Sequence, residues 1–440
     1  MGKSVWLLLS MMVAAPAAAL PVELSGNMRH RVEGIANQVR PGFERDEALW
    51  NIRTTLSATA GDGPIKAQAE LVDSRVYDAG PRTAAGTNEV NAVELVQAWI
   101  VADLDNPFGA GTKGRVQAGR FLIDIGSRRL VANEDYRNTT NGFTGLRSDL
   151  SGRGWSATLF YTLPQVRLPA DLPSIRRNRV ELDRESFDLR FAGALLGTDA
   201  LGGGLKADAG LYRLDERDRA DLPTRNRHLT TLSARVFRAP APATWHFEVE
   251  GIRQTGRIRA SAAPTAAQLP VRAWFAHASL GYTFAHPWQP RLTFEYDHAS
   301  GDRPGGAYNR FDSLFGMRRP DLGPAGLYFA IGRTNIISPA LRLEATPSKR
   351  LDAFIAWREL WLASRTDIFS TTGVRDPAGR SGRYAGSEFD GRVRWWAIPQ
   401  RLRLEANATY LRKGRFLIAA PNAPVGGDTR YYSLNGSIFF

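Results

Sequence analysis

Polar and hydrophobic residues alternate one by one along much of this chain. In the segment 401–409 the odd positions are polar, from Arg401 through Glu405 to Thr409, and leucine or alanine fills the even positions. The same alternation occurs in 50–57, 245–250, 291–297 and 389–395. Strict alternation is typical of β-strands with one apolar and one polar face, and the pattern predicts about eighteen of them. Segments 91–104 and 128–135 are predicted as weaker strands, in which the alternation slips and a bulge is expected.

The connections between these segments alternate in length. Short turn-forming joints are expected at 61–64, 151–153, 239–243, 285–290, 347–350 and 397–400. Long polar stretches lie between them, at 35–45, 79–90, 125–141, 164–182, 215–227, 255–270, 300–332, 364–385 and 413–428. Outer-membrane barrels have short periplasmic turns and long extracellular loops. The fold class predicted is therefore all-β, a transmembrane antiparallel β-barrel of about 18 strands with both termini in the periplasm.

Both ends of the chain agree with an outer-membrane location. Lys3, the apolar run 5–13 and the small residues 17–19 predict a signal peptide at 1–19, too short in its apolar core to span a bilayer, followed by a barrel domain at 20–440. In the last ten residues, apolar side chains from Tyr432 to Phe440 share one face of a strand. The terminal aromatic resembles the signature by which the outer-membrane assembly machinery recognises barrels.

The composition is compatible with a barrel although it is polar. The mean hydropathy is −0.29, 23% of the residues are charged, and there is no cysteine to form a disulfide. A barrel shows lipid only one face of each strand and encloses a wet lumen, so high average polarity is no obstacle.

Five short motifs follow one another along the chain, at 119–120, 136–145, 299–302 (ASGD), 311–316 (FDSLFG) and 338–344. Together they resemble the alginate export family of outer-membrane proteins, and the resemblance covers roughly residues 24 to 440. It implies a monomeric eighteen-stranded barrel with an arginine-rich lumen that passes an anionic polyuronate to the outside.

Arginine dominates the predicted inner face. The net charge is +13, and 51 of the 57 basic residues are arginine. The candidates for the lumen, and so for the path of a substrate, are Arg29, Arg31, Arg53, Arg190, Arg291, Glu295, Arg342, Glu344, Asp390, Arg392, Arg394, Arg401, Arg403 and Glu405. Guanidinium groups bind carboxylates through paired hydrogen bonds, so a file of them favours anions. For any single arginine, a structural ion pair is the alternative.

We therefore expect a passive channel that exports an anionic, alginate-like polysaccharide. The alternatives are an anion-preferring porin that takes up small acidic solutes, and an outer-membrane barrel hydrolase. Outer-membrane lipid and lipopolysaccharide are expected partners, and periplasmic export proteins are further candidates. The basic run 176–179 is a candidate contact for lipopolysaccharide, with solvated loop charge as the alternative. No cofactor and no nucleic acid partner is expected, and the 300–332 connection is a candidate for a loop that enters the pore.

Three further motifs have simpler interpretations. The GxGxxG match at 109–114 has no βαβ unit around it and is predicted to be a turn. The six histidines show no metal-ligand spacing. Asp297, His298, Ser300 and Asp302 are the only basis for the hydrolase alternative, and no nucleophile motif accompanies them.

Overall fold

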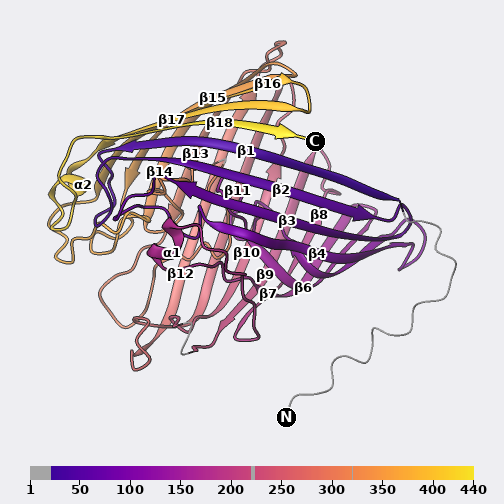
Figure 1. The fold of residues 1–440 in the computed structure, drawn as a ribbon, viewed down its shortest axis with the longest axis horizontal. Coiled ribbons are helices and arrows are strands. Elements are labelled where there is room, and N and C mark those ends of the chain that lie inside the picture. Colours follow the sequence, from indigo (N-terminus) through magenta and orange to yellow (C-terminus); the bar gives the residue numbers. More distant parts are fainter. Residues whose placement is uncertain (1–20, 220–222, 320) are drawn as a thin grey trace.

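The computed structural model describes residues 21–219, 223–319 and 321–440, so the predicted signal peptide at 1–19 lies outside the described residues. These residues form a closed antiparallel barrel of 18 strands, in which β18 pairs with β1 (Figure 1). This confirms the predicted fold. The strands are β1 (Val22–Ala36), β2 (Glu47–Ala60), β3 (Ile65–Tyr77), β4 (Asn91–Asp105), β5 (Lys113–Leu122), β6 (Gly142–Gly152), β7 (Trp155–Pro164), β8 (Leu189–Thr198), β9 (Leu205–Glu216), β10 (His228–Arg238), β11 (Thr244–Arg259), β12 (Gln268–Thr283), β13 (Arg291–Ala299), β14 (Ile336–Ser348), β15 (Leu351–Trp361), β16 (Tyr384–Ile398), β17 (Leu402–Lys413) and β18 (Thr429–Phe439).

The alternation of residue types matches the two faces of the barrel wall. In β18, Tyr432 and Leu434 are 55% and 63% exposed on the outside, whereas Ser433 and Asn435 are buried on the inside. Successive side chains of a strand point to opposite faces, so the apolar set meets lipid and the polar set lines the lumen.

The connections alternate as predicted. Eight are short, at 61–64, 106–112, 153–154, 199–204, 239–243, 284–290, 349–350 and 399–401. Nine are long, at 37–46, 78–90, 123–141, 165–188, 217–227, 260–267, 300–335, 362–383 and 414–428. The GxGxxG match falls on one of the short turns and the start of β5.

The two weak segments have different outcomes. Segment 91–104 belongs to β4, whose pairing with β3 shifts register twice, so the predicted irregular strand is confirmed. Segment 128–135 was predicted to be a strand and is not one: it lies in the connection 123–141, which folds into the barrel. Its polar groups bind side chains of the wall and its apolar residues pack inside the barrel, so no neighbouring strand is needed.

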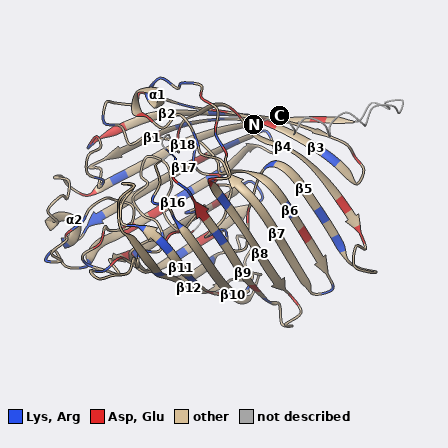
Figure 2. Ribbon diagram, turned by 90° about the horizontal axis from the view of Figure 1, so that it is seen from below, with Lys and Arg blue, Asp and Glu red and all other residues tan. Residues whose placement is uncertain are grey.

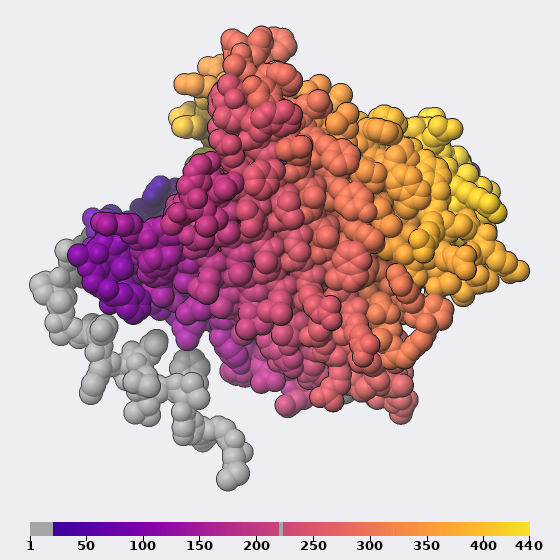
Figure 3. Space-filling model, turned by 180° about the vertical axis from the view of Figure 1, so that it is seen from behind, coloured from indigo at the N-terminus to yellow at the C-terminus, as the bar shows by residue number. Residues whose placement is uncertain are grey.

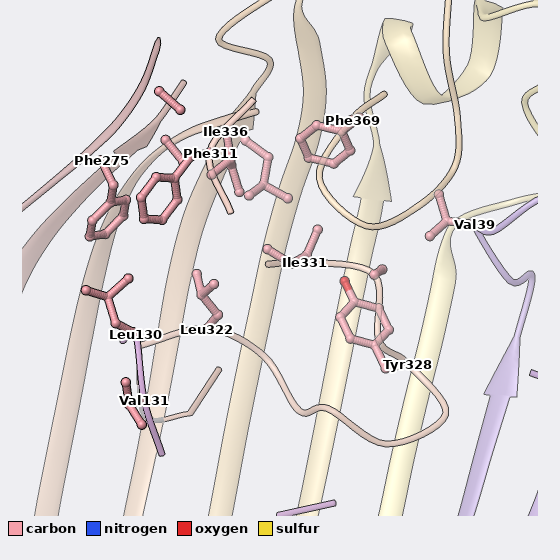
Figure 4. Close-up of a cluster of buried hydrophobic side chains, with 14 of the residues drawn as sticks. Val39, Leu130, Val131, Phe275, Phe311, Leu322, Tyr328, Ile331, Ile336 and Phe369 are labelled. Atoms are coloured by element: carbon pink, nitrogen blue, oxygen red, sulfur yellow. The ribbon is translucent and has the colours of Figure 1, made fainter. Parts of the chain in front are cut away.

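Two long connections fill part of the barrel interior. Leu130 and Val131 of the 123–141 connection belong to a buried cluster with Phe311 and Leu322 of the 300–335 connection (Figure 4). Phe315 packs against Phe143 of β6 and against Phe191 of β8, with ring centroids 5.2 and 5.1 Å apart. The 300–335 connection therefore does enter the barrel.

Helix is confined to two short turns in connections. They are α1 (Leu172–Arg176) and α2 (Arg415–Ala419). Neither of these helices, the only ones in the described ranges, has the length and apolarity to span a bilayer.

Candidate functional site: the arginine-lined lumen

Arginines from neighbouring strands form a row around the lumen wall. In the strand register Arg53 of β2 lies opposite Arg29 of β1, Arg29 lies opposite Ser437 of β18, and Ser437 lies opposite Arg403 of β17. Directly paired residues project to the same face of a sheet, so all four side chains face the lumen. Charged residues of both signs are distributed along the strands and the loops (Figure 2).

Most of this row borders a cavity of about 250 Å³. The cavity is lined by seven arginines and two carboxylates, together with polar and apolar residues from the wall and from the connections inside the barrel. Its lining residues are Arg29, Arg31, Arg128, Asp135, Tyr136, Met317, Arg319, Phe354, Arg392, Arg394, Arg403, Glu405, Asn435 and Ser437. Six of the predicted lumen residues thus meet at one cationic cavity.

Two of these arginines hold the 123–141 connection. Nη1 and Nη2 of Arg29 donate to the carbonyl oxygens of Asp135 (3.1 Å) and Arg137 (2.6 Å). Nε of Arg31 donates to Oδ1 of Asn435 (2.6 Å), and its Nη2 donates to the carbonyl oxygen of Tyr136. A carbonyl oxygen satisfies a guanidinium donor without cancelling its charge, so both residues remain sources of positive potential.

The other two arginines of the row have no carboxylate partner within the described part of the chain. Arg403 instead lies near two aromatic rings, with its guanidinium carbon 5.5 Å from the Trp396 centroid and 5.4 Å from that of Phe439. Nε of Arg53 is buried and makes no hydrogen bond.

The remaining lumen arginines share their carboxylates. Arg392 and Arg394 both bind Asp352, at 2.6 and 2.8 Å. Arg291 and Arg342 both bind Glu344. The structural ion-pair alternative therefore holds for these four, but each carboxylate serves two arginines and an excess of positive charge remains.

A second set of charges lies where the barrel meets the 300–335 connection. Arg319 of that connection contacts Asp390 of β16 at 3.3 Å, and Thr409 also donates to Asp390 (3.1 Å). Glu295 of β13 is buried on the inner face, opposite Ala340 of β14. Both predicted acids therefore face inward.

The 123–141 connection crosses the lumen. At one end, the hydroxyl of Tyr136 lies 2.8 Å from that of Tyr431 of β18. At the other end, Arg129 binds Glu248 and Glu250 of β11, the latter at 2.7 Å, and Asp321 of the 300–335 connection, also at 2.7 Å. The strand β11 lies nearly halfway around the ring from β18, so this connection forms a bar across the channel.

The sequence-based prediction of a lumen position is wrong for two residues. Arg190 of β8 is exposed on the outer face, opposite Asp215 of β9, because the adjacent Phe191 is the buried, inward residue. Arg401 lies in the turn between β16 and β17, exposed, with its N–H donated to the carbonyl oxygen of Ile398. Within β8 the apolar Phe191 packs inward against Phe315 of the 300–335 connection, so the polar Arg190 takes the outer face. For Arg401 the alternation had been extended past the start of β17.

Some site residues were missed. Asp352 could have been found, because it alternates with Ala353 and Ile355 at the start of β15. Arg319 and Tyr136 lie in irregular connections, where no periodicity reveals which wall they meet.

The residues behind the hydrolase alternative do not converge. Asp297 faces inward and binds His277 at 2.8 Å, whereas His298 faces outward against Trp274. The Ser300 hydroxyl donates to the carbonyl oxygen of Asn309 and accepts from the backbone N–H of Trp274, so it has a structural role. In the described ranges, no group of three or more histidines, aspartates or glutamates is gathered to hold a metal ion.

A closed barrel with an apolar outer wall and a charged lumen defines an outer-membrane channel. The chain belongs to the alginate export family, whose model matches residues 21–426.

Outer-membrane porins share the fold, although their sequences differ widely. The structure of Pseudomonas aeruginosa OpdQ aligns with a TM-score of 0.59 at 12% identity, over 95% of this chain and 98% of that one. OccK3 (OpdO) of the same organism aligns with a TM-score of 0.57 at 13% identity, over 95% of both chains. OpdK with vanillate aligns with a TM-score of 0.57 at 13% identity, over 95% and 98%. No curated protein matches the chain.

The location in the bacterial outer membrane follows from the family and from the fold of these porins. Both also indicate a channel rather than an enzyme.

Proposed function

We propose that this channel passes small carboxylate-bearing solutes passively, guided by the row Arg53–Arg29–Arg403. The observation that carries the proposal is that these lumen arginines have no carboxylate partner among the described residues, while the cavity beside them holds seven arginines and only two carboxylates. A mobile anion would pair with the arginines for which the barrel wall supplies no carboxylate.

The arginine row should bind a passing anion weakly at several positions rather than tightly at one. A guanidinium offers a carboxylate two parallel hydrogen bonds and keeps its charge at any physiological pH. Conduction requires several weak sites in series, because a solute must leave each site as readily as it enters. Cation–π contacts with Trp396 and Phe439, and the shared carboxylate Asp352, moderate the field at individual arginines.

The size of the solute is inferred from the bar across the lumen. The 123–141 connection is anchored on β18 and on β11, and a long polymer would have to pass beside it or displace it. This favours small acids. Export of an anionic, alginate-like polysaccharide is the second candidate, and membership of the alginate export family favours it.

Planar-bilayer recording tests the proposal. With a salt gradient across the membrane, the reversal potential of the wild-type channel should indicate anion preference, and small carboxylates should block the current. Arg53→Gln/Arg403→Gln should shift the selectivity toward cations and weaken the block. The matched control is Arg412→Gln/Arg430→Gln, which removes two exposed arginines from the outer face. Equal selectivity in all three proteins would refute the role of the row.

Oligouronates of increasing length separate the two candidates. If block weakens as the oligomer lengthens, small solutes are the substrates. If long oligomers block best and also cross into the opposite compartment, the polymer is the substrate.

A further inference from the structure

The outer wall carries an arginine patch at the extracellular end of β8–β12. It consists of Arg190, Arg213, Arg253, Arg257 and Arg272, all exposed. One carboxylate lies among them: Asp215 accepts from Nε of Arg213 (3.0 Å) and lies 2.8 Å from Nδ1 of His228. No ion pair engages the other four arginines within the described part of the chain.

The strand register makes this patch continuous. Arg213 lies opposite Thr230, Thr230 opposite Thr255, and Thr255 opposite Arg272. A second row lies two residues along each strand, toward the extracellular end. In it Asp215 lies opposite His228, and His228 lies opposite Arg257. Arg253 lies opposite Trp274, one row closer to the centre. Five arginines from β8, β9, β11 and β12 therefore form one cationic surface, with His228 and Thr230 of β10 between them.

An apolar groove on the same outer face begins at Gly251, two residues from Arg253, and runs toward the short-turn ends of β8–β11. Small residues form its floor, since Ala209 lies opposite Ala234 and Ala234 opposite Gly251. Leu196, Val236, Phe247 and Val249 flank the groove, and its volume is about 590 Å³. The wall of β8–β12 is the magenta-to-salmon surface in the centre of Figure 3.

We propose that the arginine patch and the groove together bind a phosphorylated glycolipid of the outer leaflet, the lipid A part of lipopolysaccharide. The patch lies at the long-loop end of the strands, level with Trp274, where an aromatic side chain marks the membrane interface. Arginine forks bind phosphate oxygens, and an apolar groove below them accepts an acyl chain. An arginine facing lipid costs little near the interface, which makes this depth favourable for the patch.

A second groove on the same barrel provides an internal comparison. It is lined by Ala345, Ala353, Gly391 and Ala408 of β14–β17, with a volume of about 400 Å³. Toward the extracellular end of these strands the outer face carries Trp357, Glu359 and Trp361 of β15 and a single arginine, Arg412 of β17. The second groove should therefore accept acyl chains with a weaker preference for a phosphorylated headgroup than the first.

The test measures binding of diphosphorylated lipid A and of dephosphorylated lipid A to the purified full-length barrel in detergent. Arg253→Gln/Arg257→Gln should weaken binding of the diphosphorylated form by roughly tenfold or more, since charge-assisted hydrogen bonds are lost. Arg412→Gln/Arg430→Gln, which removes the same charge elsewhere on the outer face, should bind as the wild type does. Inorganic phosphate should not compete at matched phosphate concentration.

The groove is tested separately. A Cβ at Gly251 meets no atom within 4 Å, so Gly251→Leu fits the folded wall and fills the groove. It should weaken binding of both lipid A forms, whereas Gly391→Leu in the second groove should leave the tight binding of the diphosphorylated form unchanged. Unchanged affinity in the arginine variant, equal loss in its control, or equal competition by inorganic phosphate would overturn the proposal.

Discussion

Arg29 of β1 and Arg53 of β2 lie directly opposite one another, with both side chains facing the lumen. Like charges in this cross-strand position destabilise a sheet. Among the described residues, no carboxylate forms an ion pair with either guanidinium. A wall built only for stability would not favour this pair, which is why we assign it to the passage of anions.

The first prediction concerns that pair. Arg53→Gln should raise the free energy of unfolding by roughly 0.2–1 kcal/mol, because the like-charge pair is removed, while it lowers anion selectivity. Denaturant titration of the folded barrel gives the first quantity, and the reversal potential gives the second. A variant that loses stability and keeps its selectivity would contradict the assignment.

The second prediction concerns the bar across the lumen. Arg129→Met leaves Glu250 without its buried arginine partner, whereas Asp321 keeps Arg333. The loss costs about 3–5 kcal/mol for a broken buried ion pair. The 123–141 connection should detach from β11, and single-channel conductance should rise. Arg177→Met, in an exposed part of the 165–188 connection, is the control. If conductance does not change, the bar does not restrict the pore.

The third prediction concerns topology. Tags inserted at Arg177 or Gly379 should be labelled on intact cells, because both lie in long connections. Tags at Asp62 or beside Ser348 should be labelled only after the outer membrane is opened, since these positions lie at short turns. Surface labelling at Asp62 would invert the orientation.

The fourth prediction concerns the strand that closes the barrel. The backbone N–H and C=O of Phe440 both pair with Gly26, and the Phe440 ring covers that glycine so closely that a Cβ there would clash. Phe440→Ser should therefore reduce the amount of heat-modifiable, folded barrel without affecting secretion. In the same strand, Leu434→Arg should cost about 2–4 kcal/mol and Ile438→Arg only about 0–1 kcal/mol, because the penalty falls away from the bilayer midplane. Equal costs would mean that Leu434 does not face the membrane centre.

The fifth prediction concerns pH and the 165–188 connection. Burial, together with the nearby Glu94 carboxylate, raises the pKa of Asp183 to about 7, while Leu168, Asn91 and Arg167 oppose the shift. The folded state therefore favours the protonated acid more than the unfolded state does. Protection of this connection from proteases should fall as the pH rises from about 4 to about 7 and then level off. Asp183→Asn should abolish that dependence, and a wild-type profile that stays flat would contradict it.

The sequence by itself determined the barrel. The alternation of residue types is a local property with a period of two residues, so it identified the lipid face of β18 through Leu434 and the lumen face through Asn435. The lengths of the connections determined which end of the barrel bears the loops. Even the irregularity of β4 was visible in the slipping alternation of 91–104.

Only the tertiary structure decided where side chains from distant strands meet. Arg190 faces outward because its neighbour Phe191 packs inward against Phe315, more than a hundred residues away. Arg401 lies outside β17, whose first residue the alternation does not define. The inward path of 123–141 depends on partners such as Glu250, more than a hundred residues away in the chain. The arginine row in the lumen and the arginine patch on the outer wall both arise from register between strands. That register is fixed by hydrogen bonding and closure of the whole ring rather than by any one segment.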